Sequence, residues 1–171
     1  MIATLAILLL ITVQRLAELG VAGRNTRRLL ARGAVESGAD HYLLIVVLHT
    51  AWLAGLWLLA WGHPVVVFWL AIYLVIQALR IWVIASLGER WTTRIITLPG
   101  ESLVRRGPYR FLSHPNYLVV AAEIAVAPLM FGLPLYALVF FLLNAGVLFI
   151  RIRAEQAALD RAAPTQAELQ P

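Results

Sequence analysis

Long apolar segments alternate with short polar ones along the chain. Three of these segments have transmembrane length, at 2–21, 41–61 and 65–87, because a helix needs about 20 residues to cross the hydrocarbon core of a bilayer. A further apolar stretch, 111–150, is divided by the turn sequence FGLP at 131–134. The pattern predicts five helices, of which the last two form a short, tilted hairpin, since each half of that stretch is shorter than a full span.

Composition indicates a membrane protein. The 171 residues are 61% hydrophobic and only 13% charged, with a mean hydropathy of +0.82, which lies outside the range of soluble domains. We expect an all-α integral membrane protein with a single domain over 1–171, whose cofactor-binding half spans residues 88–160. The chain has no cysteine, which excludes disulfides and thiolate metal sites. Its histidines do not have the spacing of metal ligands, so we expect no metal centre.

The placement of arginine predicts the orientation in the membrane. Arginines gather after the first, third and fifth predicted helices, whereas the turns at 62–64 and 132–134 carry none. By the positive-inside rule, the N-terminus lies outside, and the arginine-bearing loops and a C-terminal helix lie on the cytoplasmic side of a bacterial membrane. No basic run is interleaved with exposed aromatic residues, so we expect membrane lipids rather than nucleic acid as partners. The oligomeric state stays open.

The motif SHPNY, at 113–117, marks the start of the fourth helix. Proline favours the first helical position and restricts the residue before it, so His114 should cap a helix that begins at Pro115. The backbone amides of Asn116 and Tyr117 would then be free to bind an anion, such as the carboxylate of a cofactor. The same motif also suits an ordinary helix start at the membrane interface, and the local sequence does not decide between the two.

Polar residues form a stripe on the fifth predicted helix. At 100° per residue, Asn144, Leu148, Arg151 and Glu155 share one face. Arg151 has the planar fork that suits a substrate anion, Asn144 would bind the substrate beside it, and Glu155 suits a cation or a hydroxyl donor. The alternative is a simple interfacial ion pair between Arg151 and Glu155.

Glu123 is an ionisable residue within the fourth predicted helix. Because a charge at membrane depth is costly, it should face a pocket or a partner. We consider two interpretations, a catalytic base and a structural partner of an arginine, for which Arg80 is the obvious candidate. Arg15 and Glu18 have the spacing of a structural ion pair on the first helix.

Two motifs together resemble a known family. LPGESLVRRGPYRFLSHPNYL, followed by RIRAEQAAL, resembles the isoprenylcysteine carboxyl methyltransferase family over Trp91 to Leu159. The N-terminal half is similar to a bacterial subgroup whose members methylate hydroxyl groups of alkylpyrone or alkylresorcinol lipids. Two residues depart from the family pattern, namely Glu101 in place of histidine and Ser113 in place of arginine, and Arg110 is a candidate to supply the missing charge.

The resemblance implies S-adenosylmethionine as the cofactor, held among the last helices. It also implies that Arg151 handles the substrate, and that the cofactor contacts are Leu103, Val104, Tyr109, His114, Pro115, Asn116, Tyr117 and Glu155. The expected reaction is methyl transfer to an oxygen of a lipid-like acceptor. A carboxylate acceptor requires no base, whereas a phenol or enol acceptor has His114 or Glu123 as candidate bases.

Two other classes of function are compatible with the chain. One is an oxidoreductase like the membrane sterol reductases, which use NADPH and share an HPNY-related motif, although LVVAAE follows the motif in this chain in place of Gly-Glu. The other is a membrane assembly protein without catalysis, in which Arg151 and Glu155 are only interfacial. We favour the methyltransferase, because the polar stripe and the HPNY motif are expected on the same side of the membrane.

Overall fold

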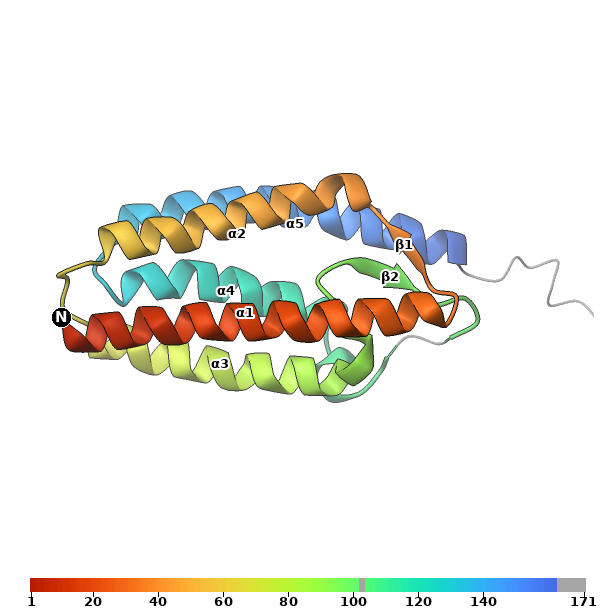
Figure 1. The fold of residues 1–171 in the computed structure, drawn as a ribbon, viewed down its shortest axis with the longest axis horizontal. Coiled ribbons are helices and arrows are strands. Elements are labelled where there is room, and N and C mark those ends of the chain that lie inside the picture. Colours follow the sequence, from red (N-terminus) through yellow and green to blue (C-terminus); the bar gives the residue numbers. More distant parts are fainter. Residues whose placement is uncertain (102–103, 163–171) are drawn as a thin grey trace, which may run out of the picture.

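The computed structural model describes residues 1–101 and 104–162, with backbone alone for 160–162. Over these residues the chain forms five α-helices that run along the long axis of the molecule (Figure 1). They are α1 (Ile2–Ala31), α2 (Ala39–Leu59), α3 (Val67–Leu87), α4 (Pro115–Leu129) and α5 (Pro134–Ala162). The prediction of an all-α protein with five helices is confirmed.

The lengths of the helices agree with the prediction at some ends and not at others. Helices α1, α2, α3 and α5 are long and apolar enough to cross a membrane. Helix α4 has 15 residues, about 22 Å at 1.5 Å per residue, and is short as predicted. Helix α5 has 29 residues in all and includes Arg151 and Arg153, so the prediction that it is short is wrong. Helix α1 continues beyond Val21, the end of its apolar segment, to Ala31. Apolar length measures the part of a helix in lipid, whereas its internal hydrogen bonds let it extend into water.

A two-stranded antiparallel sheet, absent from the prediction, lies at one end of the bundle. Strand β1 (Val35–Ser37) pairs with β2 (Ile95–Thr97), and Glu36 stands opposite Ile96. Arg94 donates a hydrogen bond of 2.5 Å to Glu36, which raises the pKa of the guanidinium above its ordinary value. Figure 1 shows this sheet beside the C-terminal part of α5 and far from the N-terminus. The connections after α1 and α3 therefore meet at one end, as the arginine pattern predicts.

The two connections that carry no arginine meet at the opposite end. The amide of Val66 donates to the carbonyl of Met130 (2.8 Å), which joins the turn before α3 to the turn before α5. The hydroxyl of Thr4 in α1 donates to the carbonyl of His63 (2.7 Å). His63 is therefore far from the arginine-rich end, and both hairpin turns are held by backbone acceptors.

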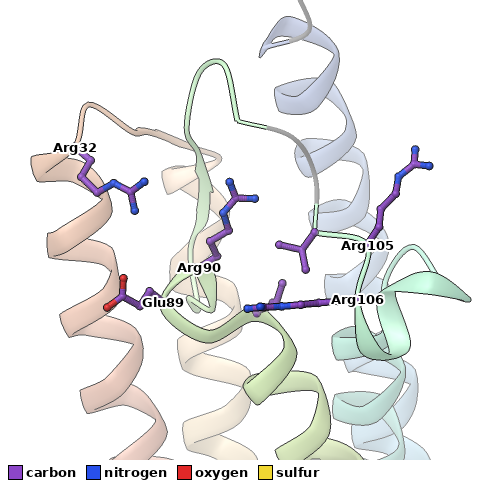
Figure 2. A pocket seen from close by; sticks show the side chains of 7 residues that line it. Arg32, Glu89, Arg90, Arg105 and Arg106 are labelled. Atoms are coloured by element: carbon purple, nitrogen blue, oxygen red, sulfur yellow. The ribbon is translucent and has the colours of Figure 1, made fainter.

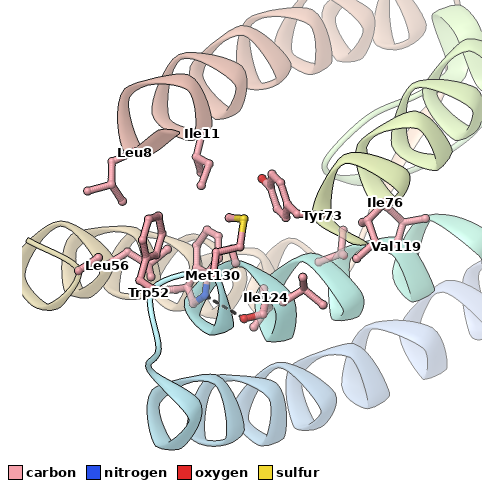
Figure 3. Packing of buried hydrophobic residues seen from close by; sticks show 14 of the residues in the cluster. Leu8, Ile11, Trp52, Leu56, Tyr73, Ile76, Val119, Ile124 and Met130 are labelled. Atoms are coloured by element: carbon pink, nitrogen blue, oxygen red, sulfur yellow. Dashed lines mark hydrogen bonds between the residues drawn. The ribbon is translucent and has the colours of Figure 1, made fainter. Parts of the chain in front are cut away.

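The apolar core lies between these two ends. Figure 3 shows Leu8 and Ile11 of α1 directed toward the side chains of α2 and α4. Trp52 of α2 is fully buried and donates from its indole to the carbonyl of Ile124 in α4 (3.2 Å). A buried indole N–H is costly without an acceptor, so this bond fixes α2 against α4.

Helices α2 and α5 pack closely at a glycine. A Cβ added to Gly55 would lie 2.2 Å from the hydroxyl oxygen of Tyr136, which itself donates to the carbonyl of Trp52 (2.8 Å). Small residues let membrane helices approach one another in this way. This contact holds the N-terminal half of α5 against α2, and the C-terminal half of α5 extends to the arginine-rich end.

Candidate functional site

A cavity of about 1220 Å³ opens at the end that carries the sheet. Its walls come from the segment after α3, from η2 (Gly107–Arg110), from the start of α4 and from the last turns of α5. Seven of the predicted site residues line it, although they are spread over 52 positions of the chain: Val104, Tyr109, His114, Asn116, Tyr117, Arg151 and Glu155. Arg110, the candidate for the missing charge, also lines it. The structure therefore brings the two motifs to one cavity.

Three predicted residues are placed elsewhere, and one lies outside the described residues. Pro115 is buried at the first position of α4 and does not line the cavity. Asn144 and Glu123 are fully buried in α5 and α4 and do not line the cavity. Leu103 lies outside the described residues.

A hydrogen-bonded network joins α4 to α5 within the cavity. The Tyr117 hydroxyl donates a short hydrogen bond to Glu155 Oε2 and accepts one from Arg151 Nε (3.0 Å). Arg151 Nη2 donates to the carbonyl of Thr93 (2.6 Å), and Arg151 is only 9% exposed. Two groups on different elements therefore fix the plane of the guanidinium.

His114 extends this network. Its ring stacks on that of Tyr117, with centroids 5.4 Å apart and planes 19° from parallel. Its Nδ1 lies 3.8 Å from Glu155 Oε2, too far for a direct hydrogen bond but close enough for a water to bridge the two. The stacked rings and the carboxylate form an electron-rich wall, which suits a cation.

The start of α4 agrees in part with the anion-site prediction. His114 is the N-cap and the helix begins at Pro115, as predicted. However, the amide of Tyr117 donates to the carbonyl of His114 (3.2 Å), so the prediction of a free donor at Tyr117 is wrong. A tight first turn satisfies that amide locally. The amide of Asn116 stays the predicted donor for an anion.

Tyr109 contributes a neutral phenol to the cavity. It belongs to η2, and both its burial and the nearby Glu155 carboxylate raise its pKa above the ordinary value. The phenol therefore keeps its proton throughout the neutral range and acts as a hydrogen-bond donor. Gly107 makes this turn possible, since its φ is +57° and an added Cβ would lie 2.0 Å from the Ser86 hydroxyl oxygen.

Trp91 and Thr93 shape the site and were not among the predicted site residues. Trp91 is 2% exposed, lines the cavity and directs its indole nitrogen toward Asn116 Oδ1 at 3.5 Å. Thr93 holds Arg151 through its carbonyl, which no side-chain pattern reveals. For Trp91 a signal existed: a large aromatic residue directly after a polar turn, at the first position of the family resemblance.

Glu123 lies in a buried ion-pair cluster between α1, α3 and α4. Its carboxylate accepts from Arg15 Nη2 (3.0 Å) and from Gln77 (2.9 Å), and lies 3.4 Å from Arg80 Nη1. Arg80 also donates two hydrogen bonds to Glu18, at 2.6 and 2.9 Å. The cluster holds two arginines and two glutamates, so its charges balance. The predicted pairs of Arg80 with Glu123 and of Arg15 with Glu18 are both present.

Asn144 is buried with neither atom of its amide paired. It is 0% exposed, and among the described residues neither Nδ2 nor Oδ1 has a hydrogen-bond partner. An unsatisfied buried amide costs about 1–3 kcal/mol. Asn144 lies on the same buried face as Arg151, two turns nearer the middle of α5. Within the described part of the chain, Asn144 therefore keeps a donor and an acceptor available at this depth of α5.

Comparison with known proteins gives the chain a family. A profile described as the isoprenylcysteine carboxyl methyltransferase (ICMT) family matches residues 69–161, more than half of the chain. This chain belongs to that family. The matched range contains all the predicted site residues, so the resemblance carried by the two motifs is confirmed. The isoprenylcysteine carboxyl methyltransferases are membrane methyltransferases that generally use S-adenosylmethionine.

Two relatives cover nearly the whole chain. The uncharacterized protein YpbQ of Bacillus subtilis is 38% identical over 88% of this chain and 93% of its own length. An uncharacterized protein of Haemophilus influenzae is 28% identical over 88% of this chain and 91% of its own length. No solved structure matches this chain. The family therefore rests on sequence, and the geometry of the site comes from the structure.

Proposed function

We propose that this chain is an integral membrane O-methyltransferase that uses S-adenosylmethionine and acts on a lipid-like acceptor. The observation that carries the proposal is the Arg151–Tyr117–Glu155 network in a large cavity at the start of α4. The acceptor is an isoprenylcysteine-type carboxylate or the hydroxyl of an alkylpyrone or alkylresorcinol lipid. The arginine-rich end that holds the cavity faces the cytoplasm, with the N-terminus outside, since the arginine-free turns meet at the other end.

The residues of the cavity fit S-adenosylmethionine. Tyr109, His114 and Tyr117 supply aromatic surfaces, and Glu155 supplies a carboxylate, which together suit a sulfonium cation and an adenine ring. The Asn116 amide at the start of α4 suits the carboxylate of the amino acid part. The volume of about 1220 Å³ exceeds the usual size of a single small-molecule pocket, about 300–1,000 Å³, so an acceptor group has room as well. When bound, S-adenosylmethionine supplies the electrophilic methyl group.

Arg151 is the residue that we assign to the acceptor. Its Nε and Nη2 are held by Tyr117 and Thr93, and Nη1 has no partner among the described residues. A guanidinium fixed on two sides presents its remaining N–H groups in one direction, which orients an oxygen anion without further ordering. Orientation and exclusion of water are therefore the main contributions of the protein.

His114 is the candidate base if the acceptor is a phenol or an enol. Its ring borders the cavity and lies near the Glu155 carboxylate, which would stabilise the imidazolium that forms. A carboxylate acceptor is already ionised between about pH 6 and pH 9 and should give a flat rate profile. A phenolic acceptor should give a rate that rises as the base loses its proton. A flat profile with a phenolic acceptor would contradict the role of His114 as a base.

Calorimetry with two cofactors tests the proposal. The purified full-length protein in detergent should bind S-adenosylmethionine and not NADPH. Glu155→Gln should weaken that binding, because the cavity loses the charge that faces the cofactor. Glu89→Gln is the matched control, since Glu89 is exposed, pairs with Arg28 and does not line this cavity. Binding of NADPH without S-adenosylmethionine would support the reductase instead. Equal binding of S-adenosylmethionine by both variants would show that Glu155 does not hold the cofactor.

A further inference from the structure

A second, smaller cavity lies beside the candidate site and is rich in arginine. It has a volume of about 620 Å³ and is lined by Arg32, Leu87, Glu89, Arg90, Val104, Arg105 and Arg106. Figure 2 shows the side chains of Arg32 and Arg90 reaching from the end of α1 and from the turn after α3 toward the same opening, with Arg106 across its base. Four arginines and one glutamate line this cavity, which gives it an excess of positive charge.

The glutamates nearby do not cancel that charge. Glu89 is paired with Arg28 on α1 (2.9 Å). The carboxylate of Glu101 is shared by two arginines, since it contacts Arg32 at 2.5 Å and also contacts Arg90. Glu101 thus shows that two guanidinium groups from different segments converge on one anion. The phosphodiester of a lipid headgroup likewise carries its charge on two oxygens, and guanidinium groups pair with phosphate as well as with carboxylate.

These ion pairs are open to competition from a ligand. The side chains of Arg32, Arg90 and Glu101 are 51%, 32% and 32% exposed, and ion pairs at such exposure contribute little. An incoming anion therefore displaces a weakly held carboxylate at small cost.

The depth of the cavity matches the headgroup region of a membrane. Leu87 lines the cavity, and Trp82, five residues earlier on α3, is 48% exposed on the apolar surface of the bundle. Five residues of helix correspond to about 7.5 Å. Exposed tryptophan is typical of the membrane–water interface, so the arginines lie at the level of lipid phosphates.

We propose that the cavity of Arg32, Arg90 and Arg106 binds the phosphate of an anionic lipid headgroup. Basic pockets between membrane helices at the interface bind such groups. The headgroup of phosphatidylglycerol carries one negative charge, whereas phosphatidylcholine adds a choline cation that the arginine excess repels. Free phosphate has the same chemistry and is the other possible source. Because the two cavities share Leu87, Arg90, Val104 and Arg105, the bound headgroup lies next to the proposed active site.

Native mass spectrometry of the full-length protein in detergent tests the proposal, with phosphatidylglycerol as the probe and phosphatidylcholine as the matched ligand. The wild type should bind one phosphatidylglycerol in preference to phosphatidylcholine. The double variant Arg32→Gln, Arg90→Gln should weaken that binding about 30-fold, roughly fivefold for each arginine near the surface. The control is Arg24→Gln, Arg27→Gln, which removes the same charge from exposed positions of α1 outside the cavity. It should change the binding less than twofold, because salt screens exposed charges that do not contact the ligand.

Glu101→Gln provides the second variant, in case the double variant does not fold. Since Glu101 competes with the ligand for two arginines, its removal should tighten the binding of phosphatidylglycerol about fivefold. If inorganic phosphate displaces the lipid from the cavity at lower concentration than the lipid itself requires, the phosphate site stands and its source is free phosphate. Equal losses in both double variants, no preference over phosphatidylcholine, or weaker binding by Glu101→Gln would each overturn the proposal. None of these measurements depends on methyl transfer.

Discussion

Replacing Tyr117 by phenylalanine tests whether the network orients Arg151. The change removes one hydroxyl, which donates to Glu155 and accepts from Arg151 Nε (3.0 Å), and leaves the ring that stacks on His114 in place. The cavity therefore keeps its shape. The guanidinium loses one of the two contacts that hold it and is free to turn about the remaining bond to Thr93.

The size of the effect follows from burial. A hydrogen bond to a charged group contributes about 1.5–3 kcal/mol. The side chain of Glu155 is 30% exposed, so water replaces much of its lost bond, whereas Arg151 is 9% exposed and loses nearly the full contribution. We therefore expect a loss of about 2–3 kcal/mol in the transition state, which is about 30- to 150-fold in kcat/KM.

The assay is transfer of a labelled methyl group by purified protein, with kcat and KM measured separately. The loss should appear mainly in kcat, because the orientation of Arg151 matters most in the transition state. Tyr136→Phe is the matched control, because the same hydroxyl is lost from a residue that donates to the carbonyls of Ala51 and Trp52 near the other end of α5. It should lower stability by about 1 kcal/mol and leave kcat/KM unchanged. A Tyr117→Phe variant within threefold of wild type would refute the role of the network.

Three further substitutions test other parts of the molecule. Glu123→Gln leaves Arg15 and Arg80 facing the single carboxylate of Glu18, so it should lower the free energy of unfolding by about 3 kcal/mol and leave kcat/KM per folded molecule near that of the wild type. A large loss of kcat at unchanged stability would instead support a catalytic role for Glu123. Asn144→Leu removes a buried amide that has no partner among the described residues, so it should raise the melting temperature in detergent, and it should also raise KM for the acceptor if Asn144 binds it. A lower melting temperature would show that the amide has a hydrogen-bond partner in the membrane. Gly107→Ala places a Cβ 2.0 Å from the Ser86 hydroxyl oxygen at a φ of +57° and should cost at least about 1–2 kcal/mol, whereas Gly146→Ala, with nothing within 4 Å, should be neutral or stabilising; equal effects of the two would contradict the packing of η2 on α3.

Much of the fold is predictable because the membrane restricts what the chain can form. Apolar length fixes where helices cross, and arginine placement fixes which connections share a side, so the meeting of the 22–40 and 88–115 connections follows from charge alone. The length of an apolar segment does not predict where the helix ends once it has left the membrane. Helices α1 and α5 therefore run about ten residues beyond their apolar segments, through arginines that a helix accommodates at the interface.

The site was predictable where side chains carry the chemistry, and unpredictable where tertiary approach decides. The stripe of Arg151 and Glu155 follows from helical spacing, and the N-cap at His114 follows from the proline after it. The bond of Arg151 to the Thr93 carbonyl needs the segment just before β2 to lie against α5, and this irregular segment has no periodicity that the sequence could reveal. The Tyr117 amide was assigned to a ligand because spacing alone does not show how tightly the first turn of α4 closes.

Glu123 shows the same limit in another form. The cost of a buried charge predicts that it has a partner, and Arg80 was correctly named. The energetic cost of burying the Glu123 carboxylate does not reveal how many side chains pair with it. Arg15, expected to pair with Glu18, also contacts Glu123, because three helices converge at this depth.

Incubation of the purified protein with S-adenosylmethionine labelled in its methyl group and a total bacterial lipid extract, followed by mass spectrometry, tests the central claim most directly. The account predicts one labelled lipid class with the label on oxygen. Arg151→Ala should abolish it, and Arg153→Ala, which removes an exposed arginine two residues further along α5, should preserve it. A lipid extract without any labelled product, or the same product from both variants, would contradict the assignment of this cavity to methyl transfer.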